Sequence, residues 1–225
     1  MNIPSKNRTL SIVLKILTFV SAAAGVIITA TSSAGTFMGG SRVFMFFTIQ
    51  SNIAIALVAF VGGVLLLGKA KIGRVWQVIK LVFTVSITLT GAVFTFVLAP
   101  TLGNHAWNFQ NVLTHVVVPI AAIADFFVVG PFGRLKKRDV FFIVLPPLAY
   151  VIYAGIGYVL GWEFLEGIRY PYFFLNWGSP AGAFGFMSGL PYMGTVWWIL
   201  ALLAGLLIVG FLYLIIIDWI KKKHK

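Results

Sequence analysis

The chain contains, from Val43 to Arg74, the stretch VFMFFTIQSNIAIALVAFVGGVLLLGKAKIGR. Its apolar part is long enough to cross a lipid bilayer, which takes about 20 mostly apolar residues. It ends in a short loop that carries Lys69, Lys71 and Arg74. An apolar run closed by basic residues is typical of a membrane-spanning helix that leads into a cytosolic loop. This pattern decides the fold class because it recurs along the chain.

The composition agrees with that interpretation. The 225 residues are 60% hydrophobic and only 10% charged, whereas soluble domains carry roughly 25% charged residues. We therefore predict an all-α integral membrane protein with six transmembrane helices in a single domain that covers residues 1–225. The six predicted spans are 10–32, 43–68, 75–100, 111–130, 140–161 and 192–217.

The basic residues predict the orientation of these spans. Fourteen of the 17 Lys and Arg residues fall on one side: before the first span, in two alternate loops and after the last span. The first group is Lys6, Arg8 and Lys15, which we count as preceding the first span, although Lys15 already falls within the predicted bounds 10–32. The positive-inside rule then puts both termini in the cytosol, and we expect a multi-pass protein of the bacterial cytoplasmic membrane. The net charge of +12 follows from this topology, so we expect no nucleic-acid partner.

The residue types also limit the kinds of site that the chain can hold. It has no cysteine, which excludes disulfides, thiolate metal sites and a Cys nucleophile. It has three histidines, one of them in the C-terminal tail, and this supply argues against a zinc site. We expect neither a metal nor an organic cofactor.

One pair of charged residues is predicted inside the spans. Lys80 and Asp125 lie at matched depths near the inner ends of the third and fourth spans. A paired charge costs less to bury than a lone one, so these two side chains can form a structural ion pair. Alternatively, each side chain extends back to the cytosolic interface. A structural role is favoured over a proton relay, because a proton-coupled transporter usually has several acidic groups within its spans.

A second group of polar residues lies near the outer ends of the second and fourth spans. Thr48 and Asn52 share one helix face by their i,i+4 spacing, and Asn111 and His115 do the same. If these faces meet, Thr48 is a candidate nucleophile and His115 its base, with amide groups to orient the imidazole or stabilise an oxyanion. The non-catalytic alternative has each side chain bonded to its own helix or to a neighbouring span.

Three stretches together resemble the androgen-induced-gene/ADTRP-like family and its bacterial six-span relatives. They are FFTIQSN at 46–52, NVLTHVVVP at 111–119 and YPYFFLNW at 170–177. The resemblance implies an intramembrane threonine hydrolase that cleaves fatty acid esters of hydroxy fatty acids, with Thr48 as nucleophile and His115 as its partner. The animal members carry an Asn-His pair where this chain has Thr114 and His115.

The sequence therefore predicts a hydrolase of a lipid carboxylic ester near the outer leaflet, with the membrane and a lipid substrate as its partners. We expect the substrate to contact residues of the polar stripes and of the last, aromatic-rich loop: Asn52, Asn111, Gln50, Tyr170, Tyr172 and Trp177. The alternatives are a small transporter for a solute or lipid and a lipid-binding membrane scaffold without catalysis. Six spans without a visible inverted repeat weigh mildly against a transporter.

Overall fold

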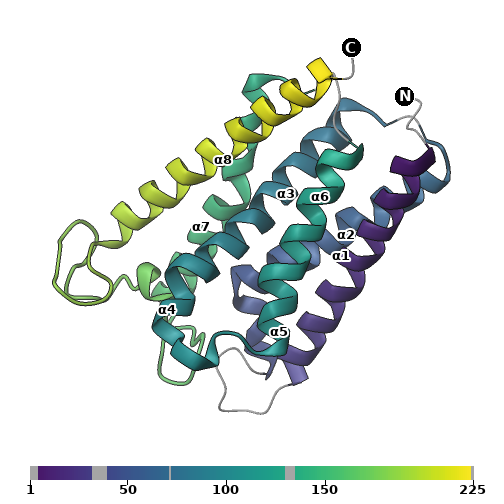
Figure 1. The fold of residues 1–225 in the computed structure, drawn as a ribbon. Helices are drawn as coiled ribbons and strands as arrows, with labels where there is room; N and C mark the ends of the chain where they lie inside the picture. Colours follow the sequence, from purple (N-terminus) through teal and green to yellow (C-terminus); the bar gives the residue numbers. More distant parts are fainter. Residues whose placement is uncertain (1–4, 32–39, 71, 130–134, 224–225) are drawn as a thin grey trace.

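A computed structural model describes residues 5–31, 40–70, 72–129 and 135–223 (Figure 1). Of the basic residues that predict the orientation, Lys71, Arg134 and Lys225 lie outside the described residues.

Within that part of the chain, six helices are long and apolar enough to cross a membrane. They are Asn7–Thr31, Phe47–Leu67, Arg74–Leu102, Phe109–Val128, Lys137–Val159 and Thr195–Lys222. Each overlaps one of the predicted spans. The described residues form no β-strand, only two isolated β-bridges. The predicted all-helical chain with six such helices is confirmed, as expected of a multi-pass membrane protein.

Three spans are unbroken helices and three combine shorter segments. The unbroken helices are α1 (Ser5–Thr31), α2 (Phe47–Leu67) and α8 (Thr195–Lys223). The third span joins α3 (Arg74–Val93), a π-helical turn η2 (Phe94–Leu98) and α4 (Ala99–Leu102). The fourth joins α5 (Phe109–Val112), a second π-helical turn η4 (Leu113–Val117) and α6 (Val118–Val129). The fifth joins a 3₁₀ helix η5 (Lys137–Val144) and α7 (Leu145–Val159), and shorter 3₁₀ turns lie at η1 (Gly40–Met45), η3 (Gly103–His105) and η6 (Phe173–Leu175).

The first four spans form the compact part of the bundle. Helix α1 packs on α2 and α6, and α3 packs on both of these in turn. Helices α7 and α8 each pack against α3, but they contact each other little, and Figure 1 shows α8 leaning away from the other helices.

Helix α1 begins and α8 ends at one end of the bundle, whereas α4 and α5 lie at the opposite end (Figure 1). The largest buried cluster lies toward this opposite end and contains Phe46, Phe94, Tyr150 and Tyr172. These residues come from the start of α2, the end of α3, α7 and the last loop. This cluster holds the last loop against the helix ends, where the sequence predicts the functional site.

Of the arrangements considered for Lys80 and Asp125, the structure contains the ion pair, and this pair has a third member. Lys80 Nζ lies 2.8 Å from Asp125 Oδ2, and Lys15 Nζ lies 2.5 Å from Asp125 Oδ1. The expectation that Lys15 precedes the first span is wrong, because this residue lies within α1 and is buried. Ser11 also donates a hydrogen bond to Asp125 and accepts one from Lys15 at 2.8 Å. A side chain that a loop position would leave in water is instead paired inside the bundle.

Candidate functional site

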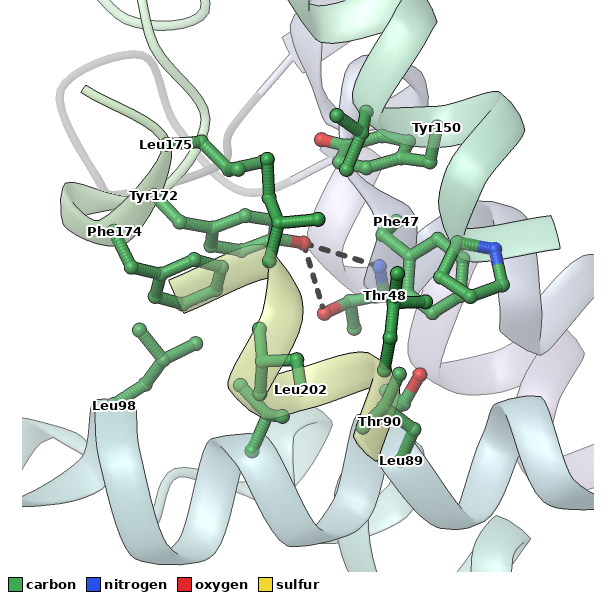
Figure 2. A pocket seen from close by; sticks show the side chains of 15 residues that line it. Phe47, Thr48, Leu89, Thr90, Leu98, Tyr150, Tyr172, Phe174, Leu175 and Leu202 are labelled. Atoms are coloured by element: carbon green, nitrogen blue, oxygen red, sulfur yellow. Dashed lines mark hydrogen bonds between the residues drawn. The ribbon is translucent and has the colours of Figure 1, made fainter. Parts of the chain in front are cut away.

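Thr48 occupies the first turn of α2, where helix geometry leaves backbone N–H groups without intrahelical partners. Its own N–H donates to the hydroxyl of Tyr172, 3.2 Å away, and its side-chain oxygen lies 3.4 Å from the same hydroxyl. Figure 2 shows Tyr172 reaching from the last loop to both atoms. The last loop is thereby fixed to the start of α2, 124 residues away in sequence.

The hydroxyl of Thr48 differs in its bonding from other threonines of the spans. The hydroxyls of Thr18, Thr29, Thr88 and Thr114 each donate to the carbonyl four residues earlier in their own helix. Thr48 makes no such bond among the described residues, because the extended Phe46 precedes the helix. The alternative in which Thr48 only satisfies its own helix is therefore not what the structure contains.

Thr48 lines a cavity of about 70 Å³ between α2, α3, α7, α8 and the last loop (Figure 2). Most of the lining is apolar, including Leu89, Leu98 and Leu202. Its composition suits a hydrocarbon chain better than a polar solute.

Four hydroxyl groups line this cavity, and three of them form hydrogen bonds of 3.2 Å or less. Tyr150 donates to the Met45 carbonyl at 3.1 Å, Thr90 pairs with Ser51 at 2.8 Å, and Tyr172 accepts the N–H of Thr48. Within the described residues, the side-chain oxygen of Thr48 has only the 3.4 Å contact with Tyr172. It is thus the cavity hydroxyl that is most loosely held.

His115 lies in the π-helical turn η4 and is buried. Its Nδ1 lies 3.0 Å from the Asn111 carbonyl oxygen and 3.0 Å from the hydroxyl of Thr114. The carbonyl can only accept, and the Thr114 proton is already donated to the Gln110 carbonyl at 2.9 Å. These contacts assign the ring proton to Nδ1, which leaves Nε2 with the free lone pair that a general base needs.

The surroundings of His115 hold the imidazole in place. Its ring stacks on Phe94, with centroids 3.7 Å apart and the planes inclined by 17°. Phe94 begins the other π-helical turn, so the two π-helical turns of the described chain meet at this contact. Such turns occur frequently at functional sites. Gly91, one turn before Phe94, permits the close approach, since a Cβ there would lie 2.9 Å from the His115 carbonyl oxygen.

Asn52 links the turn of Thr48 with the turn of His115. Its side-chain N–H₂ donates to the carbonyl of Thr48 at 2.8 Å and to that of Thr114 at 3.2 Å. The predicted common face of Thr48 and Asn52 is confirmed by the first bond. Asn52 is fully buried, and its side-chain oxygen has no hydrogen-bond partner among the described residues. This amide joins the two helices at the main chain of Thr114, next to His115, and does not contact the side chains of Asn111 or His115 through a hydrogen bond.

Thr48 and His115 themselves are not hydrogen-bonded in the described structure. The side-chain oxygen of Thr48 contacts Tyr172. The imidazole of His115 is bonded instead to Thr114 and to the main chain of Asn111. His115 also lies outside the lining of the Thr48 cavity. The two predicted catalytic groups are neighbours through Asn52, without direct contact.

The other predicted site residues have different surroundings. The Asn111 side chain donates to the Ala106 carbonyl at 2.8 Å. The contact of Asn111 with the His115 ring is made by its main-chain carbonyl oxygen. Gln50 donates to the Phe44 carbonyl at 3.1 Å and lines a separate, wider groove between α2, α3 and α7. Tyr170 and Trp177 are half-buried and do not line the Thr48 cavity. Of the predicted loop aromatics, Tyr172 alone reaches the cavity.

Three residues of the site were not predicted: Thr90, Phe94 and Tyr150. Thr90 and Phe94 come from the third span, of which the sequence singled out only Lys80, and Tyr150 comes from the fifth span. A buried tyrosine and threonine at the depth of Thr48 would have been the only signal for Tyr150 and Thr90. Among the described residues, no group of three or more His, Asp or Glu side chains is placed to hold a metal ion.

Comparison with known proteins identifies no relative of this chain. No protein-family model, no curated protein and no solved structure matches the chain. The function must therefore be argued from the residues themselves.

Proposed function

We propose that the chain is an intramembrane hydrolase of a lipid carboxylic ester, with Thr48 as nucleophile and His115 as general base. The observation that carries this proposal is the loosely held Thr48 hydroxyl at the wall of an apolar cavity. The acyl part of an ester can occupy such a cavity while its carbonyl lies at the hydroxyl. The resemblance of the three sequence motifs selects the same two residues.

The reaction requires the Thr48 oxygen to attack the ester carbonyl carbon while its proton passes to His115 Nε2. A tetrahedral intermediate forms, and the alcohol leaves with that proton as the acyl-threonine ester forms. Water then attacks the acyl carbon, gives a proton to His115 and releases the acid, which restores the Thr48 hydroxyl. The backbone N–H of Thr48 and the phenol of Tyr172 converge at this point, and both can donate to the developing oxyanion.

The proposal requires the Thr48 hydroxyl to leave Tyr172 and approach the imidazole. Catalytic hydrogen bonds are often long or misaligned before substrate binds. The 3.4 Å contact with Tyr172 is weak by length, so its loss costs little. Asn52 keeps the turns of the two residues in register while the side chain rotates.

The predicted orientation of the spans indicates on which side of the membrane the proposed reaction would occur. The Thr48 cavity lies away from the end at which α1 begins and α8 ends. If that end faces the cytosol, as the basic residues predict, the ester is cleaved near the outer leaflet of a bacterial cytoplasmic membrane.

The test is labelling of the purified protein by a fluorophosphonate probe, together with turnover of a long-chain ester. We expect Thr48→Val and His115→Ala to remove labelling and to lower turnover by at least about 10²-fold, while Thr48→Ser keeps both. Thr90→Val is the matched control, because it removes another hydroxyl of the same cavity. Labelling that survives in Thr48→Val would show that Thr48 is not the nucleophile.

A second candidate function is lipid binding without turnover. It is favoured by the absence of a hydrogen bond between Thr48 and His115 in the described structure. It predicts that a radiolabelled fatty acid or ester binds to the protein, that wild type and Thr48→Ser fail to react with the probe, and that no ester is cleaved.

A further inference from the structure

A groove at the other end of the molecule combines apolar walls with basic side chains. It lies between the start of η5 and the last turns of α8 and has a volume of about 270 Å³. Its lining includes Leu135, Lys137, Phe211, Ile215, Asp218 and Lys221. Figure 1 shows this part of α8 at the end where α1 begins, which the sequence predicts to be the cytosolic face.

The packing of α8 on η5 sets the base of this groove. At Gly210 the two segments are too close for a side chain, since a Cβ there would lie 2.8 Å from Val140 Cγ1 and nearer still to Ile143. One residue further, Phe211 meets Phe141 edge to face, with ring centroids 6.2 Å apart. Beyond this contact the groove follows α8 past Ile215, which is 62% exposed. An exposed apolar wall on a membrane helix is suited to contact with an acyl chain.

The basic side chains of the groove come from two segments far apart in sequence. Lys137 is exposed at the start of η5 and lines the groove, and its side chain forms no ion pair with another described residue. Lys221 lies 3.4 Å from Asp218, and both side chains are partly exposed. An exposed pair of this length contributes little. Two ammonium groups therefore face one carboxylate, and the groove has an excess positive charge.

We propose that this groove, the Lys137–Lys221 groove, binds an anionic phospholipid. The phosphate monoanion lies between Lys137 and Lys221, and one acyl chain lies along Phe211 and Ile215. Basic pockets between spans on the cytosolic side are suited to acidic headgroups, and each nearby Lys adds to the attraction. A zwitterionic lipid has the same chains but no net charge, so charge complementarity selects the anionic one. The site is independent of Thr48 and of the proposed hydrolysis.

The test compares dioleoyl phosphatidylglycerol with dioleoyl phosphatidylcholine, each titrated into the purified full chain in neutral detergent and followed by native mass spectrometry. For wild type we expect phosphatidylglycerol to bind about tenfold more tightly than phosphatidylcholine. Lys137→Gln with Lys221→Gln should abolish that preference. Lys69→Gln with Lys222→Gln removes the same charge from exposed positions outside the groove lining and should preserve it.

Three results would overturn the proposal. One is the absence of a preference for phosphatidylglycerol in wild type. Another is an equal loss in both double variants, which would indicate diffuse attraction to a basic surface. The third is inorganic phosphate competing at the concentration of the lipid, which would show that the apolar wall contributes nothing. Thermal unfolding of each variant without added lipid checks that the bundle is intact.

Discussion

Two polar regions lie within the spans of this bundle, and they are bonded in opposite ways. In the first region, Lys15 bonds both carboxylate oxygens of Asp125 at 2.5 and 2.6 Å, and Lys80 pairs with one of them. Ser11 and the Asp125 carbonyl, which accepts from Lys80 at 3.1 Å, complete the network. Every charged group of this ion cluster thus has several partners.

The second region, around Thr48, keeps unused bonding capacity. The Asn52 side-chain oxygen has no partner among the described residues, and the Thr48 hydroxyl has only one long contact. This region also borders a cavity. Polar groups in a membrane interior are expensive to bury. Complete pairing at the ion cluster indicates a structural role, whereas the incomplete pairing beside the cavity is what the proposed reaction at Thr48 requires.

The largest effect is expected from Asp125→Ala, which removes the only carboxylate of the ion cluster. Lys15 and Lys80 are both buried, so the variant leaves two ammonium groups without a counter-charge. Breaking a buried ion pair on one side costs about 3–5 kcal/mol. We expect the free energy of unfolding to fall by that amount, as measured by denaturant unfolding in detergent. A loss below about 1 kcal/mol would mean that the cluster is hydrated and does not stabilise the bundle.

A smaller effect on stability is expected from Gly91→Ala, which tests whether the His115 turn is tightly packed. The new Cβ would lie 2.9 Å from the His115 carbonyl oxygen and 3.1 Å from Pro119 Cγ. Overpacking of this kind costs about 1–3 kcal/mol, and it should displace the fourth span from the third. We expect ester turnover to fall together with stability. Gly205→Ala is the control, because a Cβ there meets nothing within 4 Å.

Tyr172→Phe should act on the reaction with little effect on stability. It removes the group that accepts the Thr48 N–H and is placed to donate to an oxyanion. Loss of one such donor lowers kcat by about 10²-fold in a site of this type, whereas the aromatic packing with Phe46 and Phe174 is kept. A loss of stability without a change in turnover would restrict Tyr172 to fixing the loop.

The protonation of Tyr172 gives the same test a pH dependence. Burial raises the pKa of its phenol above the ordinary value of 10.0. The phenol therefore stays protonated, and able to donate, throughout the neutral range. We expect no limb from Tyr172 in the neutral range of the pH–rate profile of wild type. A limb in that range that disappears in Tyr172→Phe would contradict the assignment.

The six helices and part of the ion cluster could be predicted from the sequence, whereas the position of Lys15 could not. The six helices follow from the length of the apolar runs, and the Lys80–Asp125 pair follows from depth along neighbouring spans. The position of Lys15 was predicted wrongly, because the sequence around a basic residue near the start of an apolar run looks the same whether the residue lies in the preceding loop or in the helix itself. Only the position of α1 against α6 shows that its side chain reaches Asp125.

At the candidate site, local periodicity predicted which residues share a helix face, such as Thr48 and Asn52. It could not predict contacts that depend on how distant segments pack. Tyr172 meets Thr48 across 124 residues, and no repeating pattern encodes that distance. The stacking of Phe94 on His115 likewise depends on how the third and fourth spans pack, because the two residues belong to different spans.

The smallest effect is expected from Lys80→Met, and it tests the excess charge of the ion cluster. Lys15 alone already bonds both oxygens of Asp125, so removal of Lys80 leaves a pair of opposite charges. The large cost of removing one side of a buried ion pair arises from the charge that is left unpaired, and Lys80→Met leaves no such charge because Lys15 still neutralises Asp125. We expect the free energy of unfolding to change by less than about 1 kcal/mol or to rise. A loss as large as that of Asp125→Ala would show that Lys80 is required beyond charge balance, through its bond to the Asp125 carbonyl, and the cluster would then act as one indivisible network.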